Sequence, residues 1–225
     1  MIDRDIDAER QQLIQAALPH VAFDGWSWAA LYLAAEDLGL DREAAVNAFP
    51  EGPVGAVELF STEADQVMLA AAGEHDLAAM KVRERIALTV RLRLEQNASH
   101  KEAIRRALSF LALPQHAVLA TRLLYGTVDA VWAAAGDTSD DFNFYSKRLL
   151  LAGVYTSTLL YWLEDKSEEN AATWAFLDRR LAEALRIGGT VGKSLGQLKA
   201  APSHLRRLAP ERRPRGRRGL GEAAS

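Results

Sequence analysis

Residues 135–163, AGDTSDDFNFYSKRLLLAGVYTSTLLYWL, decide the fold class of this chain. The stretch opens with acidic and hydroxyl residues that suit a helix start, because their oxygens accept hydrogen bonds from free backbone N–H groups. Aromatic and basic residues follow. From Leu149 to Trp162 the sequence is apolar on nearly every side, as expected for a central helix enclosed by others. The stretch therefore predicts a buried helix whose first turn can meet another molecule.

Apolar residues recur at helical spacing along almost all of the remaining sequence, and no convincing two-residue period indicates a strand. The predicted class is all-α. Glycine and proline positions such as Gly39, Pro53 and Pro114 separate the helices. The expected helices span residues 5–18, 27–37, 41–48, 54–72, 75–96, 99–112, 115–134, 140–163, 168–187 and 189–200.

The composition is that of a soluble globular protein, with 49% hydrophobic and 25% charged residues in a chain of 225. Cysteine is absent, which excludes disulfides, thiolate nucleophiles and cysteine-ligated metals and indicates a reducing compartment. The first residues, MIDRDIDAERQQ, lead us to expect neither a secretion signal nor a transit peptide, and hence a mature or bacterial cytoplasmic chain. The longest apolar window, 149–163, is too short to span a bilayer.

Charge is divided unevenly along the chain. Residues 193–225 hold nine Lys and Arg against Glu211 and Glu222, a net charge of +7, so residues 1–192 carry −10. The arginines from Arg206 to Arg218 alternate with prolines and glycines, which predicts a disordered basic tail. Such a polycation prefers anionic membrane head groups or nucleic acid, and a solubilising tail without a specific partner is the alternative.

Residues 27–50 outline a helix-turn-helix. Ser27 is placed to cap one helix, Gly39 to turn the chain, and Asp41 to cap a second, short helix. This outline, placed before a longer helical region, resembles the TetR family of regulators. Its second helix, DREAAVNAF, carries two acidic residues and one arginine inside an acidic body, which argues against contacts with DNA phosphates. A helix-turn-helix retained as structure is therefore favoured, and a ligand-responsive repressor is the alternative.

Patterns for catalysis and metal binding are weak. The five histidines are scattered, with no HExxH, no pair at i and i+4, and no Glu-x-x-His of the di-iron type. The sequence GGTVGKS at 188–194 resembles a phosphate-binding loop, but three residues rather than four separate Gly188 from the Gly-Lys pair. We expect no enzymatic activity, no metal site and no cofactor.

The segment 187–201 predicts an amphipathic helix with one apolar stripe and flanking lysines. Glycines at 188, 189, 192 and 196 disfavour this helix by about 1 kcal/mol each, so it should fold only against its own domain, a partner subunit or a bilayer. The lysines and the basic tail favour an anionic membrane surface, and ordinary core packing is the alternative. The candidate membrane contacts are Ile187, Val191, Lys193, Leu195, Leu198 and Lys199.

Aromatic and basic residues occur together in the first helical turns after the acidic cluster. Phe142, Phe144 and Tyr145 spread over too wide an arc for one core stripe, so some of them must face outward. Lys147 and Arg148 lie beside them. Exposed aromatic rings with arginine are typical of protein interfaces, and the apolar bundle behind them is expected to leave a cavity for an apolar ligand.

The string AGDTSDDFNFYSKRLLLAGVYTSTLLYWLED at 135–165, followed by TWAFLDRRL at 173–181, resembles the most distinctive part of the Coq-nine family. These are TetR-like accessory proteins of ubiquinone biosynthesis. The sequence VDAVWAAAGD at 128–137 and a weaker N-terminal match extend the resemblance over most of residues 5–200. The resemblance implies a non-enzymatic, dimeric lipid-binding protein that presents an isoprenoid quinone intermediate to a late-pathway hydroxylase.

Carried over residue by residue, the resemblance places the partner-binding patch on Asp141, Phe144, Tyr145 and Arg148, in agreement with the interface predicted from composition. It also assigns the membrane-associating helix to about 187–201. The expected ligand is an isoprenoid quinone or a phospholipid, held by the helices at 115–134 and 140–163. The candidate lipid contacts are Leu123, Val128, Trp132, Leu149, Val154 and Leu160.

The predicted architecture is a TetR-like all-α bundle in four parts: a helix-turn-helix-like region at 1–52, a lipid-binding and dimerisation domain at 53–186, the amphipathic helix at 187–201 and the basic tail at 202–225. We expect a homodimer on the inner, cytoplasmic face of a bacterial membrane, with the hydroxylase as partner and no nucleic acid. The alternatives are a TetR-type ligand-responsive repressor and a scaffold without bound lipid.

Overall fold

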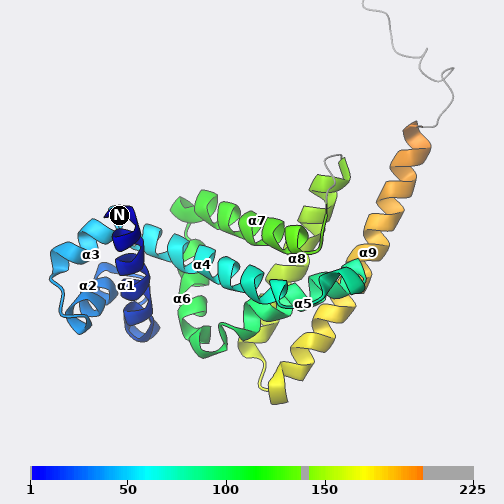
Figure 1. Ribbon diagram of the computed structural model, residues 1–225. Helices are drawn as coiled ribbons and strands as arrows, with labels where there is room; N and C mark the ends of the chain where they lie inside the picture. The colour runs from blue at the N-terminus through cyan, green and yellow to red at the C-terminus, as the bar shows by residue number, and fades with distance from the viewer. Residues whose placement is uncertain (1, 138–141, 200–225) are drawn as a thin grey trace, which may run out of the picture. The chain divides into compact units, whose positions relative to one another are not determined.

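The computed structural model describes residues 2–137 and 142–199, with side chains described for residues 7–137 and 145–187. All regular elements in these ranges are helical, which confirms the predicted class (Figure 1). The α-helices are α1 (Ile2–Asp24), α2 (Trp28–Asp37), α3 (Arg42–Ala48), α4 (Pro53–Gly73), α5 (Val82–Glu95), α6 (Lys101–Leu111), α7 (Ala117–Ala134), α8 (Phe142–Glu164) and α9 (Ala171–Lys199). Short 3₁₀ helices lie at η1 (Leu77–Ala79), η2 (Ala98–His100), η3 (Pro114–His116) and η4 (Glu168–Asn170).

Helices α2 and α3 form the helix-turn-helix, α1 packs against both, and the predicted caps are confirmed. The Ser27 hydroxyl accepts a hydrogen bond from the Ala30 N–H at 3.3 Å, and the Asp41 carboxylate accepts one from the Ala44 N–H at 2.8 Å. Gly39 turns the chain between the two helices at φ +71°, a conformation that favours glycine. Local signals in the sequence therefore account for the caps and the turn of this part of the fold.

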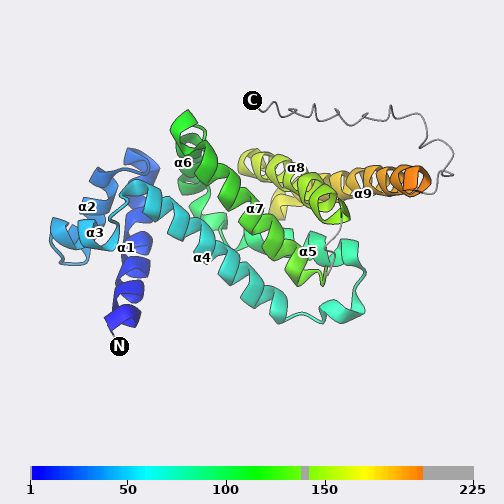
Figure 2. The same cartoon turned by 90° about the horizontal axis from the view of Figure 1, so that it is seen from above.

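The larger part of the compact unit, which extends to Gly188, is built around α4 and α7. These two helices lie side by side in both ribbon views, with α5 and α8 packed against α7 (Figures 1 and 2). Trp162 and Tyr155 of α8 are buried in the core, as are Val128 and Val131 of α7. The apolar residues that recur at helical spacing in the sequence thus pack into one continuous core between the helices.

The helix predicted at 75–96 is divided in the structure. The chain forms η1 and then begins α5 at Val82, because polar side chains satisfy the backbone at the break. The Glu84 carboxylate accepts a hydrogen bond from the Lys81 N–H at 2.9 Å, and Arg85 donates to the carbonyl oxygens of Met80 and Ala135, each at 3.0 Å. The prediction missed this break because no glycine or proline marks it.

The helices predicted at 168–187 and 189–200 form the single helix α9. Its start is defined by Asp165, whose carboxylate accepts hydrogen bonds from the Thr173 hydroxyl at 2.5 Å and from the Thr173 and Ser167 N–H groups at 2.9 and 2.8 Å. Hydrogen bonds from Thr173 and Ser167 hold the pKa of Asp165 well below its usual range. The glycines near residue 188 lower helix propensity without ending the helix.

The expectation that α8 is enclosed on all sides is wrong for the single chain. Leu149 is 65% exposed and Leu160 is 53% exposed, whereas Leu159 and Trp162 are buried. The α8 helix therefore has one apolar face in the core and another on the surface of the chain. Composition alone does not distinguish these two environments, because both faces are leucine-rich.

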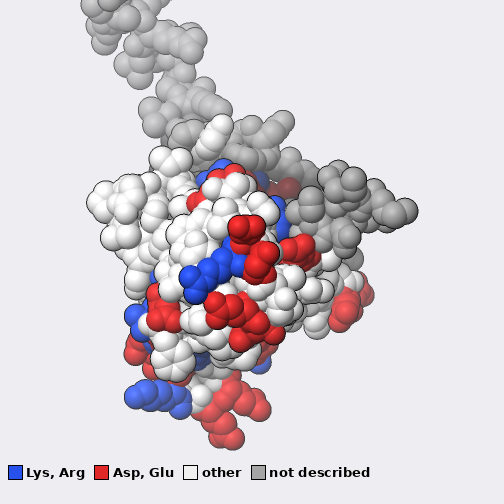
Figure 3. All heavy atoms as spheres, turned by 90° about the vertical axis from the view of Figure 1, so that its left-hand side faces the viewer, with Lys and Arg blue, Asp and Glu red and all other residues white. Residues whose placement is uncertain are grey.

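The surface of the helix-turn-helix is acidic, as the space-filling view of that end of the molecule shows (Figure 3). The only cation of α3, Arg42, pairs with Glu36 at 3.2 Å and lies 5.3 Å from the centre of the Tyr32 ring. The exposed acidic residues of this end, among the described side chains, are Asp7, Asp24, Glu36, Asp37, Asp41, Glu43 and Glu51.

No single helix in the described ranges has the length and apolar composition of a membrane span. The two segments Ala98–Leu111 and Pro114–Ala134, bent by 96°, reach that composition only when taken together.

Candidate functional site

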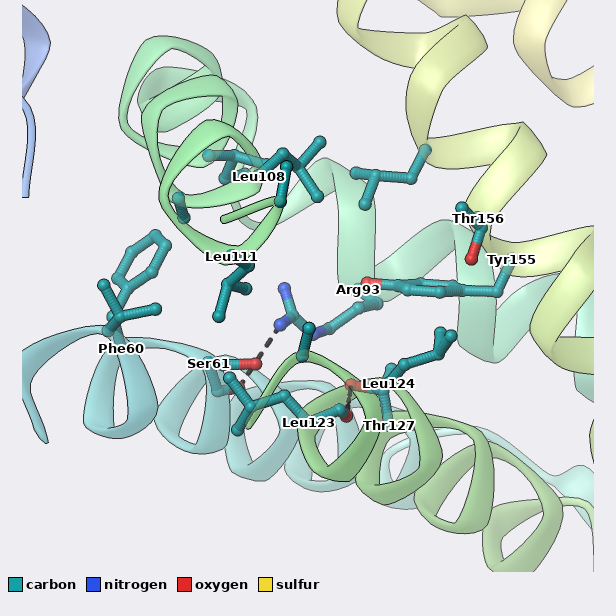
Figure 4. Close-up of a pocket in the computed structure, with 16 residues that line it drawn as sticks. Phe60, Ser61, Arg93, Leu108, Leu111, Leu123, Leu124, Thr127, Tyr155 and Thr156 are labelled. Carbon is teal, nitrogen blue, oxygen red and sulfur yellow. Dashed lines mark hydrogen bonds between the residues drawn. The ribbon is translucent and has the colours of Figure 1, made fainter. Parts of the chain in front are cut away.

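A cavity of about 290 Å³ lies between α4, α5, α6, α7 and α8 (Figure 4). Its volume is about twice that of an engineered apolar cavity of ~150 Å³ that holds benzene. The space therefore suits one ring or a short stretch of hydrocarbon chain. Its larger apolar lining residues are Phe60, Ile104, Leu108, Leu111, Leu123, Leu124 and Leu159.

Hydrogen bonds between α6 and the C-terminal end of α8 hold these two walls of the cavity together. Lys101 donates a hydrogen bond to the Trp162 carbonyl at 2.8 Å, and Arg105 donates one to the Leu163 carbonyl at 3.1 Å. These bonds use backbone acceptors left free at the C-terminal end of a helix. Leu108 and Leu111 of α6 remain half-buried, so they mark the part of the cavity nearest the surface.

One polar cluster interrupts the apolar wall. The Arg93 Nε donates to the Asp65 carboxylate at 2.8 Å, and its Nη2 donates to the Ser61 carbonyl at 3.3 Å. The Thr127 hydroxyl donates to the same carboxylate at 2.9 Å. Arg93 and Asp65 are 7% and 9% exposed, so this is a buried ion pair shared by α4, α5 and α7.

Tyr155 completes the polar side of the cavity. Burial raises the pKa of Tyr155, the nearby Arg93 lowers it, and Asp65 raises it, with a net upward shift. Its phenol therefore keeps its proton at neutral pH. Burial opposes the charge of Arg93, but the pKa of Arg93 is raised all the same, with the charge and hydrogen bond of Asp65 among the causes, so the guanidinium stays charged.

The candidate lipid contacts occupy different environments. Leu123 lines the cavity, whereas Val128, Trp132 and Val154 are buried in the core outside its lining. Leu149 and Leu160 lie on the exposed face of α8. The structure thus brings only Leu123 of these six to the cavity, and the side chains that line it from α4, α5 and α6 were not among the candidates.

At the start of α8, the candidate partner patch combines an exposed ring with a buried cation. Tyr145 is 71% exposed, but Arg148 is only 9% exposed and not the surface arginine that was expected. Its guanidinium pairs with Asp129, and with Asp137 at 3.6 Å. Phe144 belongs to α8 without a described side chain, and Asp141 lies outside the described residues.

Lys147 joins this cluster. Its ammonium lies 2.7 Å from the Asp137 carboxylate and 5.4 Å from the centre of the Trp132 ring. Lys147 and Arg148 therefore connect the N-terminal part of α8 to Asp129 of α7 and to Asp137, which follows α7. This arrangement positions Tyr145 on the surface and leaves Lys147 half-buried.

The candidate membrane contacts all belong to α9. Ile187 is 54% exposed, and the neighbouring apolar residue Leu185 is 48% exposed. Val191, Lys193, Leu195, Leu198 and Lys199 lie in the part of the helix whose side chains are not described. The basic tail at 202–225 lies outside the described residues.

Sequence reasoning missed the Asp65–Arg93–Thr127 cluster, although the sequence carried a signal for it. Arg93 follows Ile86 and Val90 on the buried stripe of α5, and Asp65 follows Ala64 in the buried stripe of α4. A charged residue on an apolar helical stripe indicates a buried pair or a site, because an unpaired buried charge is costly. The described side chains include no group of three or more potential metal ligands.

The family model COQ9 matches residues 117–188 of this chain, which include α7, α8 and the first part of α9. The chain is 34% identical over 186 residues to the ubiquinone biosynthesis protein COQ9, mitochondrial, of Drosophila melanogaster, covering 81% of this chain and 57% of that protein. It is 32% identical to the protein of that name from Rattus norvegicus, covering 87% and 66%, and 31% identical to that from Homo sapiens, covering 87% and 65%. The chain thus spans 57% to 66% of the length of these curated relatives.

The fold is similar to that of a solved structure, the TetR transcriptional regulator from Nitrosomonas europaea. The TM-score is 0.65 at 23% identity, and the match covers 78% of this chain and 97% of the regulator. The predicted TetR-like bundle is therefore confirmed.

Proposed function

The chain belongs to the COQ9 family, and on this premise we propose that it is an accessory protein of ubiquinone biosynthesis that binds an isoprenoid quinone intermediate. In this proposal it presents the lipid to a late-pathway hydroxylase and carries out no chemistry of its own. The relatives named above are ubiquinone biosynthesis proteins. The observation that carries the proposal is the largely apolar cavity enclosed by α4 to α8.

The size of the cavity determines how such a lipid would be held. A space of about 290 Å³ takes in one end of a polyprenyl molecule rather than its whole length. Removal of apolar surface from water supplies about 25 cal/mol per Å², so even partial burial gives useful affinity. The remainder of the chain would lie along apolar surface or in the bilayer.

The experiment that tests the proposal is native mass spectrometry of the full chain, followed by organic extraction and lipid analysis of what co-purifies. We expect an isoprenoid quinone intermediate or another isoprenoid lipid near one molecule per protein chain. A protein that emerges empty, and that also takes up no short-chain quinone on titration, would contradict lipid binding and favour the scaffold alternative.

For the hydroxylase, we propose docking at the patch around Tyr145. Tyr145 is the exposed ring that the Arg148 and Lys147 ion pairs hold in place. Replacing Tyr145 with alanine should weaken capture of the hydroxylase by about 30-fold or more, the range of an interface hot spot. Tyr161→Ala is the matched control, since Tyr161 is a second exposed tyrosine of α8, and an equal loss in both variants would contradict the assignment.

We also propose a homodimer and attachment to an anionic membrane surface. Leu149 and Leu160 on α8 form the apolar face that a second copy would cover. Exposed Leu185 and Ile187 begin the apolar stripe of α9 that would meet lipid. The native mass spectrum reports the dimer, and flotation with anionic vesicles, compared with a chain ending at Leu185, reports attachment.

A further inference from the structure

We propose that the cavity selects ligands carrying a neutral hydrogen-bond acceptor, such as a ring carbonyl or ether oxygen, and that Arg93 and Tyr155 are the donors that bind it. This inference rests on the proposed lipid binding and specifies the group that the ligand must carry. A quinone ring with its oxygens belongs to this class, and a bare hydrocarbon does not.

The first observation is that one guanidinium nitrogen of Arg93 has no hydrogen-bond partner among the described residues. Its Nε and Nη2 are used by Asp65 and the Ser61 carbonyl, whereas Nη1 makes no hydrogen bond to any described residue. The guanidinium extends into the cavity beside Ser61 and below Leu111 (Figure 4). The buried pair thus fixes the group in position and leaves one of its donors for a ligand.

The second observation concerns Tyr155, whose side chain is 7% exposed. Its ring reaches across the cavity toward Arg93 (Figure 4), and no described residue bonds to its hydroxyl. Since its pKa is raised by burial, the hydroxyl keeps the proton that it would donate. Two protonated donors from α5 and α8 therefore face the same small space.

Water can satisfy these donors while the cavity is empty, but a ligand that fills the cavity expels it. A hydrocarbon would then leave the Arg93 Nη1 and the Tyr155 hydroxyl without hydrogen-bond partners, which costs more than the hydrogen bonds themselves are worth. A ligand with an oxygen atom next to Arg93 and Tyr155 restores the hydrogen bonds that water made. Sites built on buried donors discriminate in this way against analogues that lack the acceptor.

The charge balance favours a neutral acceptor over an anion. The Asp65 carboxylate already neutralises Arg93 at 2.8 Å, and the surrounding wall is apolar. An added carboxylate or phosphate would leave one uncompensated negative charge in this environment, which is costly. A carbonyl or ether oxygen accepts the hydrogen bonds without adding charge.

The test compares three probes whose alkyl chains have similar lengths of about ten to twelve carbons. The probes are a decyl-substituted dimethoxy-methyl-benzoquinone, decylbenzene and dodecanoate. Binding is measured by displacement of a fluorescent apolar dye from the full chain. We expect the quinone to bind about 10- to 100-fold more tightly than decylbenzene, the range for hydrogen bonds to charged donors. Dodecanoate should bind more weakly than the quinone at pH 8.

Two variants remove the donors without requiring a new fold. Tyr155→Phe deletes a hydroxyl that has no partner among the described residues, and it should reduce the preference for quinone about 2- to 10-fold. Asp65→Leu combined with Arg93→Met replaces the whole buried pair by apolar side chains, which proteins often tolerate. This double variant keeps the Tyr155 hydroxyl, so its preference for quinone over decylbenzene should fall to about 2- to 10-fold.

The matched controls are Tyr161→Phe on α8 and Arg91→Met on α5, which alter an exposed tyrosine and an exposed arginine outside the cavity lining. Both should keep the full preference. Equal binding of quinone and decylbenzene by the unchanged protein, or tighter binding of dodecanoate, would overturn the inference while leaving lipid binding intact. Failure of all three probes to bind would overturn the proposed function as well.

Discussion

The N-terminal region of α1 to α3, which contains the helix-turn-helix, and the cavity domain of α4 to α8 belong to one TetR-like fold, but they differ in what their surfaces offer a ligand. In the first, Arg42 is paired with Glu36 and surrounded by exposed carboxylates. In the second, Arg93 is paired with Asp65 and still presents a free donor to an apolar space. The contrast shows that one fold can place one arginine in an ion pair on an acidic surface and another in a buried ion pair beside an apolar cavity.

The largest effect is expected from breaking the buried pair in the cavity domain. Replacing Arg93 with methionine leaves the Asp65 carboxylate buried without its cation, since the Thr127 hydroxyl is its only other described partner. The free energy of unfolding should fall by about 3–5 kcal/mol, measured by urea denaturation monitored by circular dichroism.

The control for this loss is the combined Asp65→Leu and Arg93→Met variant, which should recover most of the stability because no charge remains buried. If Arg93→Met alone were as stable as the unchanged protein, the pair would not be buried in solution, and the contrast with the exposed pair of Arg42 would disappear.

A second, smaller effect should follow from filling the cavity. Ala120 lines it from α7, and leucine at this position adds about three methylenes to a space that a ligand would occupy. Each methylene of the ligand that is kept out of the cavity forfeits about 0.8 kcal/mol of burial. Lipid affinity should therefore fall by about 2 kcal/mol, or roughly 30-fold. The amount of lipid that co-purifies, measured by extraction and mass spectrometry, reports this change.

Ala133→Leu provides the matched control, because Ala133 lies on the exposed side of the same helix. It should leave co-purifying lipid unchanged. An equal reduction in both variants would indicate that α7 had been disturbed as a whole and that the cavity is not where the lipid binds.

The helical class and the helix-turn-helix were predictable because both depend on local chemistry. The caps at Ser27 and Asp41 and the turn at Gly39 are signals contained within a few residues. The break before Val82 was not predictable in the same way, because Arg85 stabilises it through the Ala135 carbonyl, fifty residues away in the sequence. The helix propensities of residues 75–96 contain no information about a partner so far away in the sequence.

The candidate site was predictable only in part, for a related reason. Apolar composition correctly indicated the helices that form the core, but it does not separate an apolar side chain in the core from one that lines the cavity or from an exposed one. Leu123, Val128 and Leu149 read alike in the sequence and occupy these three environments. The burial of Arg148 depends on Asp129 and Asp137, whose approach requires the packing of α7 against α8.

In the helix-turn-helix, the cap of α3 should matter for stability. Asp41→Ala removes the acceptor for the Ala44 N–H and should lower the free energy of unfolding by about 1 kcal/mol. Asp41→Asn, which keeps an oxygen at the same place, is the control and should cost much less. A result in which neither change affects stability would mean that α3 is not held as the structure describes.

The smallest effect on stability is expected from changing the charge of α3. Glu43 and Asn47 are exposed, so replacing both with lysine should alter the free energy of unfolding by no more than about 0.5 kcal/mol. The same change should strengthen salt-dependent, sequence-independent DNA binding, because two cations are added to an acidic surface. The unchanged protein is expected to show no sequence-specific DNA binding in a gel-shift assay at physiological salt. Specific binding that Glu43→Lys with Asn47→Lys left unaltered would place a DNA site elsewhere, whereas specific binding that these changes abolished would restore α3 as a groove-reading helix and remove the distinction between the two halves of the fold.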